Sequence, residues 1–327
     1  MEIALNPMNS KKIIILENNS ELGAGTRGSS LGIAALKVAA LKTKKNYFTK
    51  YKTEVVEDNN ELLHEANGNE LAVNAEGILD VLNKVHDQVK SILDRNKFPI
   101  VLAGDHSSAA GTIAGIRSAN PDARVGVIWL DAHADLHSPY TTPSGNIHGM
   151  PLAMSLGVDN IEHRKNAVDH ETAAIWSELK SFGGVERKID VADLVFISVR
   201  DTEEAEDYFI SEKNIKQFDV QDVRRRGVKE ISDETLNYLK DCDHIYLSFD
   251  VDCMDCDLVS YGTGTPVPNG LTENEAAGLI NHFLIDKRVC CFEIVEINPC
   301  LDNKQNAMAE SAMRILENAT NIIEKRG

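Results

Sequence analysis

The sequence predicts an α/β protein with a mainly parallel central sheet between two layers of helices, folded as a single three-layer domain over residues 1–327. Short runs of apolar, often β-branched residues alternate with longer stretches that have helical periodicity. The apolar runs are continuous, as expected for strands that are buried on both faces. No linker rich in Pro, Ser or Gly, no low-complexity tract and no internal repeat divides the chain, so one domain is expected.

The expected strands are runs rich in Val, Ile, Leu and Phe, a composition that suits a buried pleated surface. In chain order they cover residues 12–16, 98–103, 125–131, 194–199, 244–249 and 289–297. The segments between them predict helices, because apolar residues recur there at intervals of three and four, as at Ile78, Val81, Leu82 and Val85. The expected helices include residues 71–96, 171–182, 233–242, 273–286 and 307–325.

The net charge of the chain excludes several classes of partner. The chain carries 51 acidic and 34 basic side chains, so its formal charge is −17. A surface of this sign does not displace counterions from phosphates, so binding to nucleic acid is not expected, and neither is docking on anionic lipid. A cationic small-molecule substrate is allowed by this charge.

The sequence also predicts a cytoplasmic location. The apolar run that follows Lys11 and Lys12 has only four residues, too few for the core of a signal peptide. No run approaches the roughly 18 apolar residues of a membrane-spanning helix, so no membrane association is expected. All six cysteines lie in the last third of the chain, and in a cytoplasmic protein this favours free thiols over a disulfide framework.

Four polar clusters directly follow apolar runs, at the carboxyl ends of expected strands. In an open α/β sheet, ligands bind beyond these ends, so the clusters are expected to meet at one edge. Their polar members are Asp105, His106 and Ser107 in the first, Asp131, His133 and Asp135 in the second, Asp250 and Asp252 in the third, and Glu296 and Asn298 in the fourth.

The second and third clusters have the composition of a metal site. Asp131, His133 and Asp135 are spaced by two, so an extended backbone turns all three side chains to one side, and Asp250 and Asp252 share this spacing. Converging carboxylates are costly to bury, and no Lys or Arg lies within these motifs. A single Asp at a strand end usually caps a helix or forms a turn, but the combination indicates divalent metals. A set of ligands that is rich in oxygen and includes imidazole suits Mn²⁺. The number of ligands is large enough for two metal ions with bridging carboxylates.

Together the four clusters resemble the motif blocks of the ureohydrolase family, the binuclear manganese enzymes that include arginase and agmatinase. The order and spacing of the blocks match, from about Ile13 to the C-terminal helix. The loop SPYTTPSGNIHG that begins at Ser138 and the stretch GTGTP that begins at Gly262 resemble the arginase branch in particular. The resemblance implies an arginase-like fold, two Mn²⁺ ions per chain, and hydrolysis of the guanidinium group of L-arginine to L-ornithine and urea by a metal-bridging hydroxide.

The resemblance also implies a role for each residue of the site. One manganese would be held by His106, Asp131, Asp135 and Asp250, and the other by His133, Asp131, Asp250 and Asp252. His148 would shuttle a proton to the leaving amine, and Glu296 would pair with the planar guanidinium. Asp135 would be catalytic together with His148 and Glu296, and Asp105 would orient the metal ligands.

The amino-acid end of the substrate would meet four further residues. Ser144 resembles a family residue that hydrogen-bonds the α-carboxylate, and Glu206 resembles one near the α-amino group. His137 stands where the family usually has an asparagine that helps hold the α-carboxylate, and Glu203 stands where an aspartate usually takes the α-amino group. Each of these two changes alters the reach by about one bond. The resemblance further implies a homo-oligomer, a trimer or a hexamer.

Several alternatives stay open at this level. The chain could act on another guanidino substrate, such as agmatine or 4-guanidinobutyrate, or it could be a non-catalytic metal-binding relative, against which the intact ligand set argues. A zinc amidohydrolase of the deacetylase type would use one metal and leave His106 and Asp252 unexplained. Cys253 and Cys256 could form a redox pair or half a zinc site, but no second C-x-x-C motif completes such a site, so packing is favoured.

Overall fold

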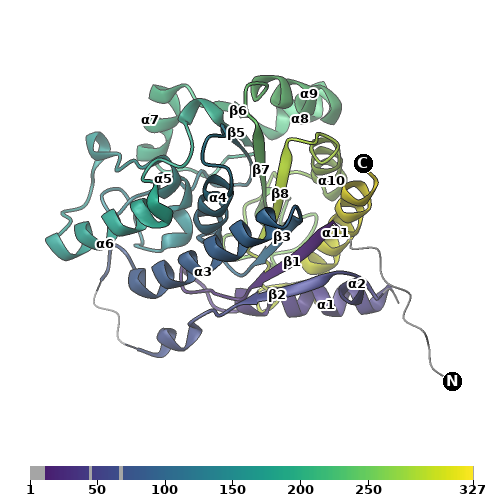
Figure 1. The fold of residues 1–327 in the computed structure, drawn as a ribbon, viewed down its shortest axis with the longest axis horizontal. Helices are drawn as coiled ribbons and strands as arrows, with labels where there is room; N and C mark the ends of the chain where they lie inside the picture. The colour runs from purple at the N-terminus through teal and green to yellow at the C-terminus, as the bar shows by residue number, and fades with distance from the viewer. Residues whose placement is uncertain (1–11, 44–45, 66–68, 327) are drawn as a thin grey trace.

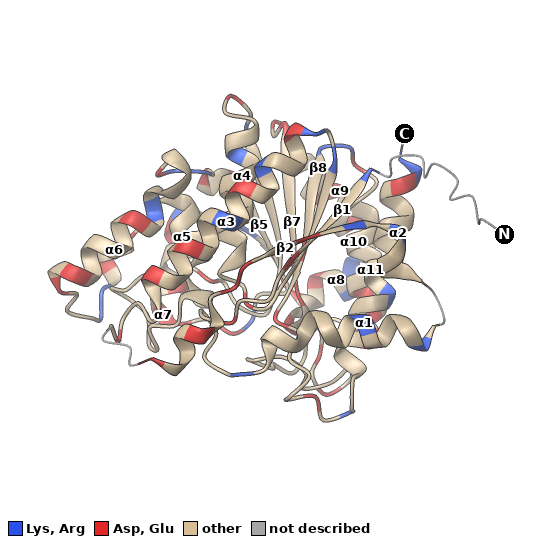
Figure 2. Ribbon diagram, turned by 60° about the horizontal axis from the view of Figure 1, so that its bottom comes forward, with Lys and Arg blue, Asp and Glu red and all other residues tan. Residues whose placement is uncertain are grey.

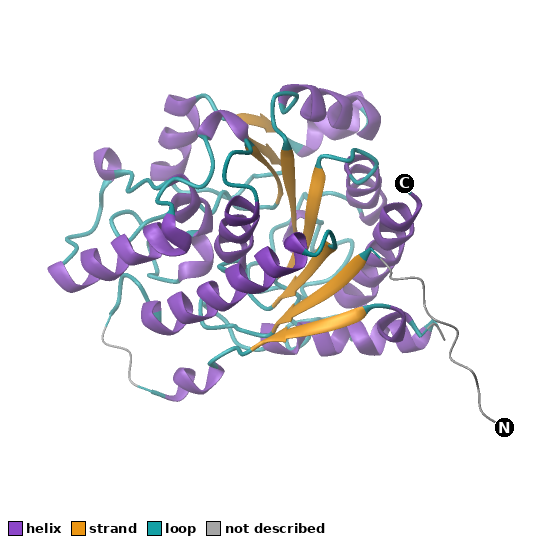
Figure 3. Cartoon of the chain, viewed as in Figure 1, coloured by secondary structure: helices purple, strands orange, loops and turns teal. Residues whose placement is uncertain are grey.

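The computed structural model describes residues 12–43, 46–65 and 69–326, and its centre is a sheet of eight strands (Figures 1 and 3). The strands lie in the order β2-β1-β3-β8-β7-β4-β5-β6, and neighbours pair in parallel throughout. All carboxyl ends of the strands therefore lie at the same edge. The bounds are β1 Ile13–Asn18, β2 Lys52–Val56, β3 Phe98–Ala103, β4 Val125–Leu130, β5 Leu194–Ile197, β6 Lys216–Phe218, β7 His244–Asp250 and β8 Val289–Val295.

Helices cover both faces of the sheet and produce three layers (Figure 3). One face is covered by α3 (Ala75–Asp94), α4 (Ser108–Ala119), α5 (Pro151–Leu156), α6 (His170–Ser181) and α7 (Glu204–Lys213). The other face is covered by α1 (Gly32–Lys42), α2 (Tyr47–Lys50), α8 (Val220–Arg226), α9 (Val228–Tyr238), α10 (Glu273–Phe283) and α11 (Ala307–Lys325).

Two hydrophobic cores lie on the two sides of the sheet, because successive side chains of each strand point to opposite faces. In β1, Ile13 and Ile15 join one core, whereas Ile14 and Leu16 join the other. This double burial is the reason why the strands read as continuous apolar runs. Charged residues lie mostly on the helices and loops, and the inner strands carry few (Figure 2).

The predicted three-layer α/β fold with a parallel sheet is confirmed. All six expected strands are present, and their ends differ from the prediction by at most two residues. The two strands that the sequence analysis missed, β2 and β6, are the edges of the sheet, and β2 (KTEVV) is mostly polar because only part of it is buried. Helix α4 was missed for the opposite reason, since residues 108–116 are all buried and show no amphipathic period.

Residues 1–11, which precede the apolar run that was considered as a signal-peptide core, lie outside the described residues. Within the described part of the chain, no helix is long and apolar enough to cross a membrane.

Candidate metal centre

The order of the strands brings the four polar clusters together. The strands that precede them, β3, β8, β7 and β4, are consecutive neighbours in the middle of the sheet. Each cluster begins where one of these strands ends, so all four lie at the carboxyl edge. This arrangement is the one that the sequence analysis predicted from the positions of the clusters alone.

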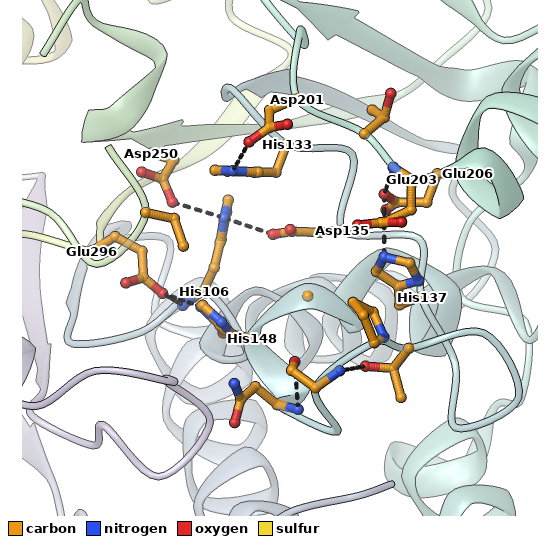
Figure 4. Close-up of a pocket in the computed structure, with 17 residues that line it drawn as sticks. His106, His133, Asp135, His137, His148, Asp201, Glu203, Glu206, Asp250 and Glu296 are labelled. Carbon is orange, nitrogen blue, oxygen red and sulfur yellow. Dashed lines mark hydrogen bonds and ion pairs between the residues drawn. The ribbon is translucent and has the colours of Figure 1, made fainter. Parts of the chain in front are cut away.

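His106 lies among three carboxylates, of which Figure 4 shows those of Asp135 and Asp250. Its Nδ1 atom is 3.0 Å from Asp131 Oδ2, 3.1 Å from Asp135 Oδ2 and 3.2 Å from Asp250 Oδ2. All four residues are buried. One imidazole nitrogen within hydrogen-bond distance of three acid oxygens is a set of atoms that can converge on a single cation.

The orientation of the His106 ring is fixed by contacts on the side away from the carboxylates. Its Nε2 atom lies 2.7 Å from Ser248 Oγ, and its ring stacks on Trp129 with centroids 4.0 Å apart and planes 4° apart. Further into the interior, the Tyr246 hydroxyl donates to Glu293 Oε2 over 2.8 Å. A donor–acceptor contact on Nε2 leaves Nδ1 directed at the carboxylates, which is how metal-binding histidines are usually held.

His133 organises a second group of acids. Its Nδ1 atom is 3.1 Å from Asp252 Oδ2 and 3.5 Å from Asp131 Oδ1, and its Nε2 atom is 3.6 Å from Asp201 Oδ2. Asp201 was not anticipated from the sequence, although Glu203, two residues later, was. The ligand atoms of His133, Asp131 and Asp252 lie within 4.8 Å of one another, as do those of His106, Asp131 and Asp135. Asp131 is thus common to both groups.

The cluster fits a pair of divalent cations. His106 Nδ1 and Asp131 Oδ2 are buried and lie 3.0 Å apart, but neither atom makes a hydrogen bond of good geometry within the described part of the chain. Burial and the charge of Asp131 raise the pKa of Asp135 to about 6, and burial together with Asp252 and Asp131 raises the pKa of Asp250 well above its ordinary value. Burial alone would lower the pKa of His133, but Asp252 and Asp131 raise it, so the site favours positive charge among its acids, and two bound metals would supply that charge.

The Asp250→Asn variant is expected to be more heat-stable than the unsubstituted chain when both are free of metal. The folded-state pKa of Asp250 is raised, so its ionisation penalty is absent below the unfolded pKa of about 4, grows as the pH rises through the folded pKa, and is full above it. Asparagine removes the charge and keeps an oxygen that accepts from Asp252 N, a bond of 2.9 Å. Calorimetry in EDTA should show a Tm gain of a few degrees at pH 8 that vanishes near pH 4. An equal gain at both pH values would contradict the charge explanation.

Glu296 and His148 form a pair beside this cluster (Figure 4). Glu296 Oε1 accepts from the backbone N of His106 over 2.9 Å and from His148 Nδ1 over 3.0 Å, while Oε2 is buried without a hydrogen-bond partner among the described residues. Burial alone would lower the pKa of His148, but Glu296 raises it to about 9. Glu296 and Asp135 both have a left-handed backbone, with φ of 65° and 50°, a strained conformation that is common at functional sites.

Asp105 ties the surrounding loops together. Its Oδ2 atom accepts from Gly23 N over 2.9 Å, and its Oδ1 atom accepts from Ser107 N over 2.9 Å. Gly23 has no room for a side chain, because a Cβ atom there would lie 2.9 Å from Asp105 Oδ1. Asp105 therefore holds the loop after β1 against the turn that carries His106.

A cavity of about 250 Å³ is lined by His106, His133, Asp135, Asp250, His148 and Glu296. The residues that the sequence assigned to the amino-acid end of the substrate all reach it: His137, Ser144, Glu203 and Glu206. The cavity is also lined by side chains that were not assigned, among them Thr142, Asn146, Asp201, Thr202 and Thr265. Each of these residues lies within or beside one of the motif stretches, so its closeness to a motif in the sequence was the signal that could have identified it. Among the residues that the structure describes, no Lys or Arg lines the cavity, so its acids favour a cationic ligand.

The six cysteines take no visible part in this site. All of them lie in the described residues as free thiols, and Cys253 and Cys256 are both buried. Burial raises the pKa of the Cys253 thiol well above its ordinary value, which makes it unreactive. This environment agrees with a packing role for both.

Comparisons with known proteins agree on one family. The sequence model of the arginase family matches residues 11–321. The arginase of Bacillus subtilis is 34% identical over 94% of this chain and 97% of its own length, and the arginase of Bacillus caldovelox is 35% identical over the same shares. Among solved structures, Bacillus cereus arginase superposes with a TM-score of 0.79 at 31% identity over 96% of this chain and 98% of its own. Entamoeba histolytica arginase in complex with L-ornithine gives 0.80 at 27% identity over 96% and 99%.

Proposed function

This chain belongs to the arginase family, and we propose that its buried cluster of acids and histidines holds two Mn²⁺ ions that serve the hydrolysis of a guanidinium group. The chain is a binuclear metal hydrolase of the arginase type, and its reaction converts L-arginine to L-ornithine and urea. The observation that carries this proposal is the convergence of three carboxylates on His106 Nδ1, next to a second group that shares Asp131. The relatives do not favour the alternative guanidino substrates.

The proposed ligand sets follow the two groups of contacts. His106, Asp131, Asp135 and Asp250 would hold one ion, and His133, Asp131, Asp250 and Asp252 the other. Manganese is proposed because carboxylate oxygens outnumber nitrogens and no thiolate is present in either group. When bound, the two ions supply Lewis acidity that activates water near neutral pH.

Glu296 is proposed to orient the guanidinium. Its Oε2 atom is buried and unpaired among the described residues, so it can accept an N–H of the substrate without breaking an existing bond. The contacts of Oε1 with His106 N and His148 hold the carboxylate in place. A fixed acceptor for a planar donor group positions the central carbon for attack.

His148 is proposed to move the proton that the leaving amine needs. Glu296 holds its Nδ1 atom, so Nε2 is the nitrogen that exchanges a proton with the reacting groups. Its raised pKa keeps the ring protonated near neutral pH, so it can act as a general acid toward the departing nitrogen. Asp135 raises the pKa further by its charge.

The substrate assignment is tested with three guanidino compounds. With Mn²⁺ added, L-arginine should give a kcat/KM at least roughly tenfold above those of agmatine and 4-guanidinobutyrate. The expected cause is the outer part of the cavity, where the hydroxyl of Ser144 can donate to the α-carboxylate and Glu203 can accept from the α-amino group. Urea release is measured for each compound, with EDTA-treated protein as the control. Equal values for the three compounds would contradict specificity for L-arginine.

The domain organisation and the assembly of the chain follow from the same features. We propose that the chain is a single domain, because all eight strands join one sheet, and that it assembles as a trimer or hexamer, as the family resemblance implies. Light scattering on the purified protein measures the assembly, and a monomer would contradict it. The cytoplasmic location stays a prediction from the sequence.

A further inference from the structure

We infer that His137 and Glu206 form a clasp, a side-chain pair that positions the N-terminus of α7 and with it Glu203, and that neither member of the pair binds the substrate directly. From the family resemblance, both residues were expected to contact the substrate, His137 at the α-carboxylate and Glu206 near the α-amino group. The inference rests on the proposed function, because it concerns how the same cavity recognises the amino-acid end of the substrate.

Both ring nitrogens of His137 already have partners within the protein. Nε2 lies 3.3 Å from Glu206 Oε2, a contact drawn as a dashed line in Figure 4, and Nδ1 lies 3.2 Å from Thr141 Oγ1. The backbone N of His137 donates to Gly149 O over 3.0 Å, which fixes the residue between two turns of its loop. A ring held at both nitrogens has no free donor for a substrate carboxylate.

Both carboxylate oxygens of Glu206 also have partners within the protein. Only 4% of the residue is exposed, and its Oε1 atom accepts from Leu136 N over 3.0 Å. Its Oε2 atom accepts from Glu203 N over 3.0 Å and faces His137. Burial alone would raise the pKa of Glu206, but the contact with His137 and the two backbone N–H groups lower it, so the carboxylate is stabilised as an anion inside the protein.

The clasp joins two segments that are far apart in the sequence. Leu136 and His137 directly follow Asp135, a proposed metal ligand, whereas Glu203 and Glu206 form a capping box at the start of α7. Glu203 itself is exposed at the cavity, unlike Glu206. The pair therefore fixes the distance between the metal-binding loop and the acid that is placed to meet the α-amino group.

Direct binding of the α-carboxylate by His137 would require the ring to leave Glu206. Within the described part of the chain no other side chain donates to this buried carboxylate, so the movement would be a costly change. Ser144 is better placed to bind the carboxylate: its Oγ accepts from Asn146 N over 3.2 Å, and its hydroxyl proton stays available. The α-carboxylate is therefore left to Ser144 and its neighbours.

The first test needs no substrate. Unfolding of the metal-free protein is measured for His137→Ala, Glu206→Gln and the double variant. If the two side chains form a clasp, the decreases in the free energy of unfolding caused by the two single substitutions are not additive. The double variant should then lose about as much free energy of unfolding as the less stable single variant. Additive losses would overturn the inference. This measurement does not depend on the enzyme activity, so it remains decisive even if L-arginine proves not to be the substrate.

The second test asks whether His137 acts through Glu203. In the Mn²⁺-loaded protein, His137→Ala and Glu203→Gln should each raise the KM for L-arginine roughly tenfold and leave kcat within a few-fold, and the double variant should be no worse than either. Multiplicative effects would mean two independent substrate contacts and would overturn the inference. His163→Ala is the matched control, because the His163 ring stacks on Tyr208 of α7 at 4.4 Å but lies outside the cavity. The KM of this variant should not change. If it rose as much as that of His137→Ala, the effect would come from a general loosening of α7, and the inference would be overturned.

Discussion

Replacing Asp131 with asparagine is expected to lower the hydrolysis of L-arginine by roughly 10³-fold or more, because two metals contribute several kcal/mol of transition-state stabilisation. Asp131 is the residue that both groups of potential ligands share, with Oδ2 at 3.0 Å from His106 Nδ1 and Oδ1 at 3.5 Å from His133 Nδ1. One substitution therefore weakens both proposed metal positions. Asparagine keeps the shape but loses the charge, so the effect reports on metal binding.

The measurement is the number of manganese ions that each chain retains after dialysis, alongside urea formation. The unsubstituted chain should retain close to two, and the Asp131→Asn variant fewer than one. Asp241→Asn is the control, since Asp241 is an exposed aspartate that precedes β7 on the amino side of the sheet and away from the cluster. A variant at Asp131 that keeps two ions and full activity would contradict a shared ligand.

Replacing His148 with asparagine should produce the opposite pattern, with metals retained and turnover reduced by about 10²- to 10⁴-fold. The His148 ring pairs with Glu296 and belongs to neither proposed ligand set, so its loss leaves both sets intact. Asparagine cannot exchange a proton near neutral pH, so delivery of a proton to the leaving amine would fall to water.

Metal content and kcat are measured on the same preparation of this variant. A matched control is His86→Asn, because His86 is bound to Ser118 over 2.8 Å and lies outside the cavity. The proton-transfer role would be wrong if the His148 variant lost its manganese together with its activity. It would also be wrong if turnover remained near that of the unsubstituted chain.

The residue types of the site could be predicted from the sequence because the relevant signal is local. Alternation along an extended backbone directs Asp131, His133 and Asp135 to one side, and Asp250 and Asp252 repeat the pattern. The buried strands could be predicted for the same reason, since burial on both faces forces continuous apolar runs. The edge strand β2 and the fully buried helix α4 lack such periodic signals and were missed.

Contacts across the fold could not be predicted in this way. The bond from His106 N to Glu296 joins residues 190 positions apart, and the pairing of Ser248 with His106 joins residues 142 apart. Asp201 and the pairing of His137 with Glu206 also became visible only in the structure, because they depend on where the loop after β5 and the start of α7 pack. The family resemblance assigned a role to each residue separately. It did not indicate which of these residues contact one another.

The sequence by itself therefore determined the fold class, the acids and histidines that follow the strands, and the chemistry that such a set can perform. The tertiary structure alone decided that β3, β8, β7 and β4 are neighbours, so that the four clusters meet at one cavity. The physical reason is that spacing along a strand sets the direction of a side chain, whereas its distance from a residue on another strand is set by strand order and packing. Those are properties of the whole sheet and its two hydrophobic cores.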